Sequence, residues 1–167
     1  MDYDILISGG GIAGLTAAAA FGSAGFSVLC VDPAPPVTER DVDGSDLRTT
    51  AFLQPAQELL ETCGLWARLD SHAAPLQVMR IVDAGGDVAE PRIVKDFDAA
   101  DISGKPFGWN LPNWLLRREM VARLAELDNV DFRPGTGTDS LFTREAEARV
   151  GLSDGSRVRT RLVVAAD

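Results

Sequence analysis

The chain has 167 residues, of which 46% are hydrophobic and 25% charged, and it carries a formal net charge of −9. These values are typical of a folded globular protein with one core. The acidic balance offers no basic surface to nucleic acid or to an anionic membrane, so we expect no nucleic-acid partner. The sequence contains no leader and no apolar run of transmembrane length. We therefore expect a cytoplasmic protein, with room for peripheral membrane contact in the full protein.

An apolar run at residues 3–8 leads into a glycine-rich turn, Gly9-Gly10-Gly11-Ile12-Ala13-Gly14. In such a turn between a strand and a helix, the first glycine of G-x-G-x-x-G permits the tight bend. The second admits a phosphate close to the backbone, and the third lets the helix pack closely. The unpaired amides of the helix add a positive dipole at the same point. We predict that a nucleotide pyrophosphate is held by Gly9, Gly11, Ile12, Ala13 and Gly14.

A helix and a second strand complete a βαβ unit after this turn. Ala18 and Gly25 are small residues that we expect to let the helix lie close to the sheet. The second strand, at residues 27–31, is followed by Asp32. The separation along the sequence between the glycine turn and Asp32 is close to that expected for the carboxylate that binds the adenosine ribose. The electrostatic repulsion between this carboxylate and a 2′-phosphate would cost about 1 kcal/mol in water and about 4 kcal/mol at an effective dielectric of 20. Asp32 therefore disfavours NADP and leaves FAD and NAD open.

The remaining pattern alternates helices and strands. Residues 33–46 are rich in Pro, Asp and Gly, which predicts a long polar loop. Cys30, Cys63 and His72 lack the spacing of a metal or redox site, so we predict no metal and two buried thiols. The elements that we expect are helices at 55–63 and 113–127, a hairpin of strands at 77–83 and 88–95, a strand at 130–132, a small antiparallel meander between 140 and 160, and a central parallel strand at 162–167.

Four stretches together resemble the FAD-dependent aromatic hydroxylases, which are single-component flavoprotein monooxygenases. Within this family the chain is most similar to the ubiquinone-biosynthesis hydroxylases. The first two stretches are the fingerprint at 5–32 and the D-x-R segment at 46–52 with the helix ending in Gly-Leu-Trp at 59–66. The third comprises 97–102, Phe107-Gly108 and 113–117, and the fourth is Asp154-Gly155 followed by 162–167. The last stretch resembles the entry to the family's second cofactor motif, although Ala165 replaces its usual glycine.

The resemblance assigns further residues to the cofactor. It places Arg48 near the pyrophosphate and ribityl chain, Asn113 against the flavin and Arg117 close to the cofactor. It also brings the backbone of Thr138 to the adenine, and makes Asp167 a support for FAD and for transient contact with NAD(P)H. From the residues alone, Arg48 is equally well a solvated arginine and Asn113 a helix N-cap. A solvated helix face would explain Arg117 equally well.

The resemblance implies a Rossmann-like α/β FAD-binding domain over residues 1–167, with 77–108 as the inserted start of a substrate-domain β-layer. The implied activity is hydroxylation of an aromatic ring with FAD, NAD(P)H and oxygen, the substrate being a small, lipid-tailed phenol such as a polyprenylated phenol of ubiquinone biosynthesis. Because the sequence stops at the end of a buried-type strand, we expect an N-terminal fragment that is inactive alone.

The sequence leaves two other functions open and disfavours a third. The chain is also compatible with another FAD oxidoreductase, of the amine oxidase or prenyl reductase type. A non-catalytic dinucleotide-binding fragment would show the same fingerprint. An NAD-linked dehydrogenase is disfavoured, because no second series of strands and helices builds a nicotinamide-binding half.

Overall fold

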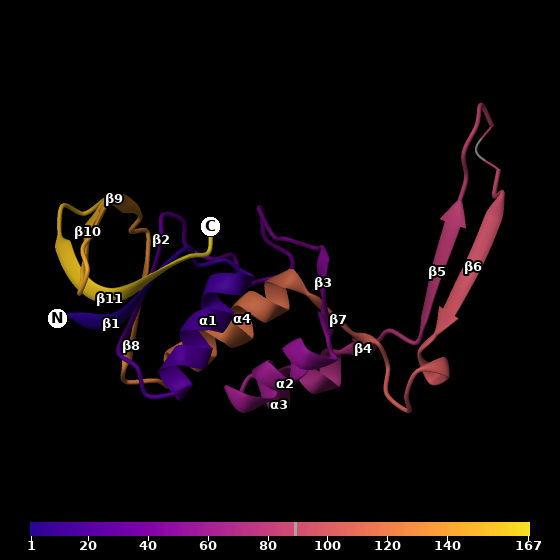
Figure 1. The fold of residues 1–167 in the computed structure, drawn as a ribbon, viewed down its shortest axis with the longest axis horizontal. Helices are drawn as coiled ribbons and strands as arrows, with labels where there is room; N and C mark the ends of the chain where they lie inside the picture. Colours follow the sequence, from indigo (N-terminus) through magenta and orange to yellow (C-terminus); the bar gives the residue numbers. More distant parts are fainter. Residues whose placement is uncertain (89) are drawn as a thin grey trace.

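The computed structural model describes residues 1–88 and 90–167, and its largest unit is a six-stranded sheet (Figure 1). Its strands are β1 (Tyr3–Ser8), β2 (Val28–Asp32), β8 (Val130–Pro134), β9 (Thr138–Thr143), β10 (Ala148–Leu152) and β11 (Arg157–Ala165). Their order is β8-β2-β1-β11-β10-β9. The neighbours β8, β2, β1 and β11 pair in parallel, whereas β10 pairs in antiparallel with both β11 and β9. The predicted α/β fold with a parallel sheet and an antiparallel meander is confirmed.

Two helices, α1 (Ile12–Ser23) and α4 (Asn113–Leu124), lie side by side against one face of this sheet (Figure 1). The helices bury Leu15, Ala18, Leu116 and Met120 in the main core cluster with residues of β1 and β2. Gly22 lets α1 approach β8 closely, because a Cβ there would stand 2.3 Å from Cγ2 of Val130.

Two expectations about these helices need correction. Gly25 does not permit the close packing of α1, because it sits in the turn to β2 at a φ of +90° with open space around it. Gly22 has that role instead. The second helix, predicted to reach residue 127, ends at Leu124. Beyond that residue the amides of Glu126 and Leu127 bond to carbonyls only three positions back, which tightens the chain into a turn.

The meander covers part of the opposite face of the sheet, where Leu6, Leu29 and Val31 pack against Val150 and Val158. One strand, β11, contributes to both the meander and the parallel sheet. Its first half pairs with β10 in antiparallel, and from Thr160 onward it pairs with β1 in parallel. The prediction of two separate strands at 157–160 and 162–167 is therefore wrong. The sequence pattern changes because the pairing partner changes, and the strand ends at Ala165.

A smaller antiparallel sheet follows the long polar loop. Its strands are β3 (Thr49–Leu53), β7 (Gly108–Pro112) and β4 (Ala74–Pro75), in the order β3-β7-β4. The sheet is joined by α2 (Gln54–Thr62), α3 (Trp66–Leu69) and the short 3₁₀ turn η1 (Asp70–His72). Trp66 and Trp109 meet edge to face, with ring centroids 5.3 Å apart. The helix α2 confirms the predicted 55–63 segment, whereas β3 and β7 were not predicted.

A two-stranded hairpin projects from the rest of the molecule (Figure 1). It consists of β5 (Val78–Asp83) and β6 (Ile93–Asp98), and a 3₁₀ turn, η2 (Ala99–Asp101), follows it. Every residue of the two strands is exposed. The returning strand begins at Ile93, later than predicted, and Ala89 of the predicted strand lies outside the described residues. None of the described helices has both the length and the apolar character needed to cross a membrane.

Candidate cofactor site

The glycine turn lies at the carboxyl ends of β1, β2 and β11, and its glycines have different surroundings. Gly9 has a φ of +117°, and a Cβ there would stand 2.5 Å from the carbonyl carbon of Ala166. A Cβ on Gly14 would stand only 1.8 Å from the carbonyl oxygen of Gly9. A Cβ on Gly11, in contrast, would have no atom within 4 Å. The turn is therefore packed tightly at Gly9 and Gly14 and open at Gly11.

The first amides of α1 point into this open space. Gly11 is the N-cap residue, and no side chain caps the helix. The amides of Ile12 and Ala13 precede the first intrahelical hydrogen bond and so have no partner within the helix. The first turn carries no acidic side chain that would oppose an anion. This end of α1 can therefore donate hydrogen bonds to a phosphate.

The carboxylate of Asp32 is held in place by two backbone amides. The amide of Gly10 donates to Oδ2 at 2.6 Å, and the amide of Ala34 donates to Oδ1 at 2.8 Å. Each oxygen keeps a further lone pair, with which it can accept a hydroxyl hydrogen. A Cβ on Gly10 would stand 2.8 Å from Cβ of Asp32. Gly10 was missed as a site residue, and the signal for it was a glycine at the position between Gly9 and Gly11, where the motif does not require one.

These groups line a cavity of about 170 Å³ beside the turn. Gly10, Gly11 and Asp32 form its base, the loop residues 34–37 form one wall, and Arg117 of α4 completes it. The side chain of Arg117 is mostly buried. Its neighbour Arg118 instead lies over the ring of Trp114 and pairs with Glu119. Of the two adjacent arginines, only Arg117 reaches the turn.

Asp46 connects Arg117 to the other residues that the sequence singled out. Its carboxylate accepts two hydrogen bonds from the guanidinium of Arg48, at 2.8 and 2.9 Å. It also accepts one from Nδ2 of Asn113 at 2.9 Å, and a nitrogen of Arg117 lies 3.6 Å away. The Arg48 hydrogen bonds, followed by that of Asn113, lower the pKa of Asp46. Asp46 was missed as a site residue, although it stands in the D-x-R segment.

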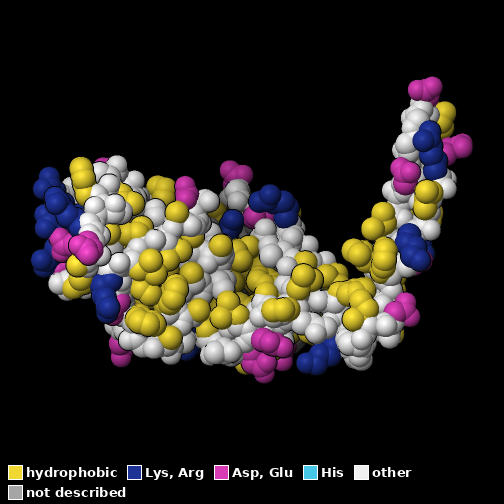
Figure 2. Space-filling model, viewed as in Figure 1, with side chains coloured by type: hydrophobic (Ala, Val, Ile, Leu, Met, Phe, Trp, Pro, Cys, Tyr) yellow, Lys and Arg dark blue, Asp and Glu magenta, His cyan; other side chains and the backbone are white. Residues whose placement is uncertain are grey.

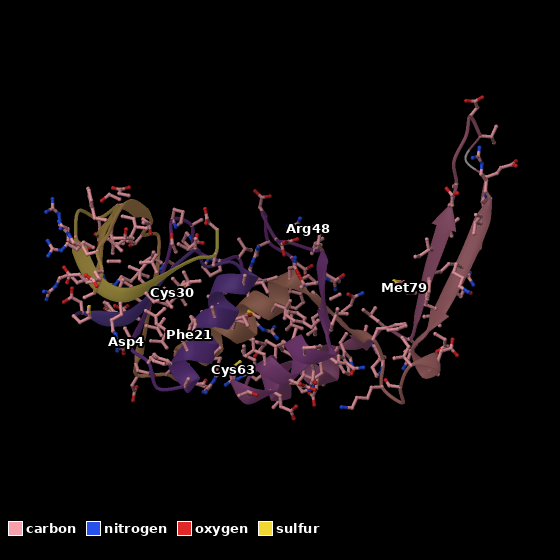
Figure 3. All side chains as sticks on the ribbon, in the orientation of Figure 1. Asp4, Phe21, Cys30, Arg48, Cys63 and Met79 are labelled. Carbon is pink, nitrogen blue, oxygen red and sulfur yellow. The ribbon has the colours of Figure 1, made fainter. Side chains whose placement is uncertain are left out.

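Arg48 and Asn113 occupy different environments. The side chain of Arg48 is 83% exposed and does not line the cavity (Figure 3 labels it beside β3). Asn113 is buried and is not the N-cap of α4, because Pro112 occupies that position. Its Oδ1 accepts a hydrogen bond from the hydroxyl of Thr50 at 2.7 Å. The N-cap interpretation of Asn113 is therefore wrong, and its side chain joins α4 to β3 and the loop.

Thr138 and Asp167 lie near the same edge of the sheet. The connection that leads to Thr138 runs past Asp32, because the amide of Gly135 donates to the Asp32 carbonyl at 2.8 Å. Oγ1 of Thr138 is buried, and it has no hydrogen-bond partner among the described residues. The backbone nitrogen of Asp167 would lie 2.7 Å from a Cβ on Gly9. Asp167 thus stands against the first glycine, with an exposed side chain.

The two cysteines lie in the interior (Figure 3). Burial raises the pKa of Cys30 to about 12, which keeps its thiol protonated and unreactive. Its Sγ lies 3.8 Å from the carbonyl oxygen of Gly9, so it packs beneath the turn. Burial also raises the pKa of Cys63, where the backbone hydrogen bond to Leu65 and the nearby Arg123 act in the opposite direction. Both thiols are structural.

This arrangement of sheet, turn and carboxylate defines a nucleotide-binding α/β domain. Residues 2–167 match the family model described as an FAD binding domain, so the chain belongs to this family and FAD is its cofactor. The chain is 34% identical, over 98% of its length, to ubiquinone hydroxylase UbiL of Rhodospirillum rubrum. It is 26% identical, over 98% of its length, to ubiquinone hydroxylase UbiM of Neisseria meningitidis. The chain spans 37% and 35% of these two relatives.

A solved structure supports the fold. The p-nitrophenol 4-monooxygenase PnpA from Pseudomonas putida DLL-E4 matches with a TM-score of 0.75 and 20% sequence identity. The match covers 98% of this chain and 40% of that one. At this identity the likeness establishes a shared fold.

Proposed function

We propose that the glycine turn binds the FAD pyrophosphate and that Asp32 binds the hydroxyls of the adenosine ribose. The proposal depends chiefly on one observation: open space at Gly11 lies beside unpaired helix amides and a carboxylate fixed by two backbone amides. The amides supply donors to the phosphates, and the carboxylate supplies acceptors to the hydroxyls. The residues present thus fit the cofactor.

Further contacts extend the proposed site along the cofactor. Arg117 stands in the cavity and would pair with a phosphate oxygen. Arg48 is exposed and tethered to Asp46, so it can donate its remaining N–H groups toward the ribityl chain while Asn113 holds the tether. The buried hydroxyl of Thr138, which lacks a partner among the described residues, would meet the adenine end. Asp167 would act at the opposite end, beside Gly9.

The activity that we propose for the whole protein is NAD(P)H- and O₂-dependent hydroxylation of an aromatic ring, with a polyprenylated phenol of ubiquinone biosynthesis as the substrate. Both curated relatives named above are ubiquinone hydroxylases, which supports this choice. Bound FAD would supply the redox chemistry. This chain's residues would bind and orient the cofactor and shield its phosphates from water, and none of them needs to act as acid, base or nucleophile.

We also propose that residues 77–108 begin a second layer that contacts the substrate, while the rest of residues 1–167 binds FAD. The hairpin supports this division, because its two strands expose apolar side chains on both faces. A two-stranded ribbon is at best marginally stable by itself in water. Further strands or a substrate-facing layer would cover it. The location we propose is the cytoplasm, with peripheral membrane contact.

Titration of the purified chain with FAD tests the cofactor proposal. We expect saturable binding, visible as a change in flavin fluorescence and as yellow protein after desalting. Protein that stays colourless throughout would favour a non-catalytic fragment and contradict the proposal. Incubation with NADPH, oxygen and a phenol should yield no hydroxylated product from this chain alone. Reduction of its bound flavin by an amine would favour the amine oxidase alternative.

A further inference from the structure

A cavity of about 370 Å³ lies on the meander, separate from the one at the glycine turn. Antiparallel partners share a face of a sheet, and here Phe142 pairs with Arg149 while Gly151 pairs with both Ser140 and Arg157. The alternate residues Val150 and Val158 point into the core. We call the outward-facing set, Ser140, Phe142, Arg144, Arg149, Gly151 and Arg157, the arginine face.

The centre of the arginine face is hollow because Gly151 has no side chain. A Cβ there would stand 2.5 Å from Oγ of Ser140, so no larger residue fits without displacing that hydroxyl. Phe142 lines the hollow and is 66% exposed. Phe142 and the arginines that line the same hollow place an apolar surface next to a cationic one.

Positive charge on this face is only partly neutralised. Arg149 pairs with Glu147 at 2.7 Å. Within residues 1–88 and 90–167, neither Arg144 nor Arg157 makes an ion pair. Lys and Arg side chains gather at this end of the molecule in Figure 2, with some Asp and Glu side chains among them. Because charges farther apart than about 8 Å are screened at physiological salt, the net charge of −9 does not cancel a local cationic site.

We propose that the arginine face docks on an anionic phospholipid surface, with Arg144 and Arg157 binding the phosphates and Phe142 entering the headgroup region. Guanidinium groups bind phosphate oxygens through paired hydrogen bonds, and aromatic rings concentrate at the membrane interface. Single-stranded nucleic acid would call for a row of stacking aromatics, and this face has one ring. The choice of a lipid rests on the proposed function, because a polyprenylated substrate resides in the bilayer.

Co-sedimentation with vesicles tests the proposal. The chain should bind vesicles of phosphatidylcholine with phosphatidylglycerol and not vesicles of phosphatidylcholine alone, and added salt should weaken the binding. Arg144→Gln and Arg157→Gln should each weaken it about fivefold, and Phe142→Ser should weaken it further. Arg118→Gln removes the same charge from α4 and should leave binding unchanged. All four side chains are exposed, so circular dichroism should show a retained fold.

Several outcomes would overturn the proposal. These are binding to neutral vesicles of equal strength, binding that survives the double Arg144→Gln/Arg157→Gln variant, and no vesicle binding at all. If inorganic phosphate alone binds at these arginines and vesicles do not, the face serves a soluble phosphate compound instead of a membrane. FAD titration of the same variants should give the parental affinity. A chain that binds FAD but no vesicles would fail this proposal alone.

Discussion

Gly11 and Gly14 lie three positions apart in the turn, and an alanine substitution at each tests a different property of the site. Gly14→Ala would place a Cβ 1.8 Å from the backbone oxygen of Gly9, which cannot move aside without distorting the turn. We expect a loss of stability of about 1–3 kcal/mol. Gly11→Ala meets open space at a φ of −71°, so stability should change by less than about 0.5 kcal/mol while FAD affinity falls. Urea unfolding and FAD titration of both variants measure the two effects. A Gly14→Ala protein of parental stability would contradict the packing argument.

Asp32 is the side chain on which cofactor binding should depend most. Asp32→Ala removes the acceptors for the ribose hydroxyls and leaves the amides of Gly10 and Ala34 without their partner. Hydrogen bonds to charged groups contribute about 1.5–3 kcal/mol, so FAD affinity should fall about tenfold to hundredfold. Asp128→Ala makes the same change of charge at an exposed position and serves as the control. Equal FAD affinity in the two variants would remove Asp32 from the site.

The loop after β2, the strand β3 and the helix α4 meet at Asp46, and their connection should depend on pH. The pKa of Asp46 lies below its ordinary value of 3.8, chiefly through the hydrogen bonds from Arg48. A carboxyl with a lowered folded pKa stabilises the fold fully above the unfolded value, and this contribution is lost as the pH falls through the folded value. Asp46→Asn should therefore lower the urea midpoint at neutral pH, and the gap to the parent should narrow below 3.8.

The matched control for this experiment is Asp43→Asn in the same loop. The Asp43 side chain accepts a hydrogen bond from the neighbouring Gly44 amide and is exposed. The urea midpoint of Asp43→Asn should equal that of the parent at every pH. A gap between Asp46→Asn and the parent that stays constant with pH would show that the network does not depend on the carboxylate charge.

The sequence predicts those elements whose pattern is set by local packing. The β1–α1–β2 unit follows from its continuous apolar strand runs and the glycine turn, and α2, α4 and the meander follow from periodicity. The strands β3 and β7 were missed because only Phe52, Gly108 and Leu111 of their ten residues are buried, which leaves a loop-like pattern. The continuity of β11 was missed because its partners change along its length.

For the site, the sequence could identify residue types but not the contacts between distant residues. The turn and Asp32 lie within one βαβ unit, so their proximity follows from a known local geometry. Asp46 and Asn113 are 67 positions apart, and nothing in the sequence indicates that their side chains meet. The role of Gly10 depends in the same way on the position of the Asp32 side chain. Long-range side-chain contacts required the structure.

The arrangement in space also predicts that the hairpin can be removed without loss of cofactor binding. The core clusters contain no residue of β5 or β6. The ends of the hairpin already meet, because the amide of Ala99 donates to the carbonyl of Gln77 at 2.8 Å. A short glycine link between these two residues, replacing residues 78–98, should therefore leave the rest of the fold intact. Removal of the exposed apolar side chains should also reduce aggregation.

Thermal unfolding with and without FAD measures this outcome. A ligand that binds only the folded state stabilises it by about 2.7 kcal/mol at a concentration one hundred times its Kd. We expect the same FAD-induced shift in the shortened chain as in the parent, and a reduced shift when Asp32→Ala is added to either. A shortened chain that folds but gains no stability from FAD would place part of the cofactor site on the hairpin. A full shift would show that cofactor binding and the hairpin are separable parts of this protein.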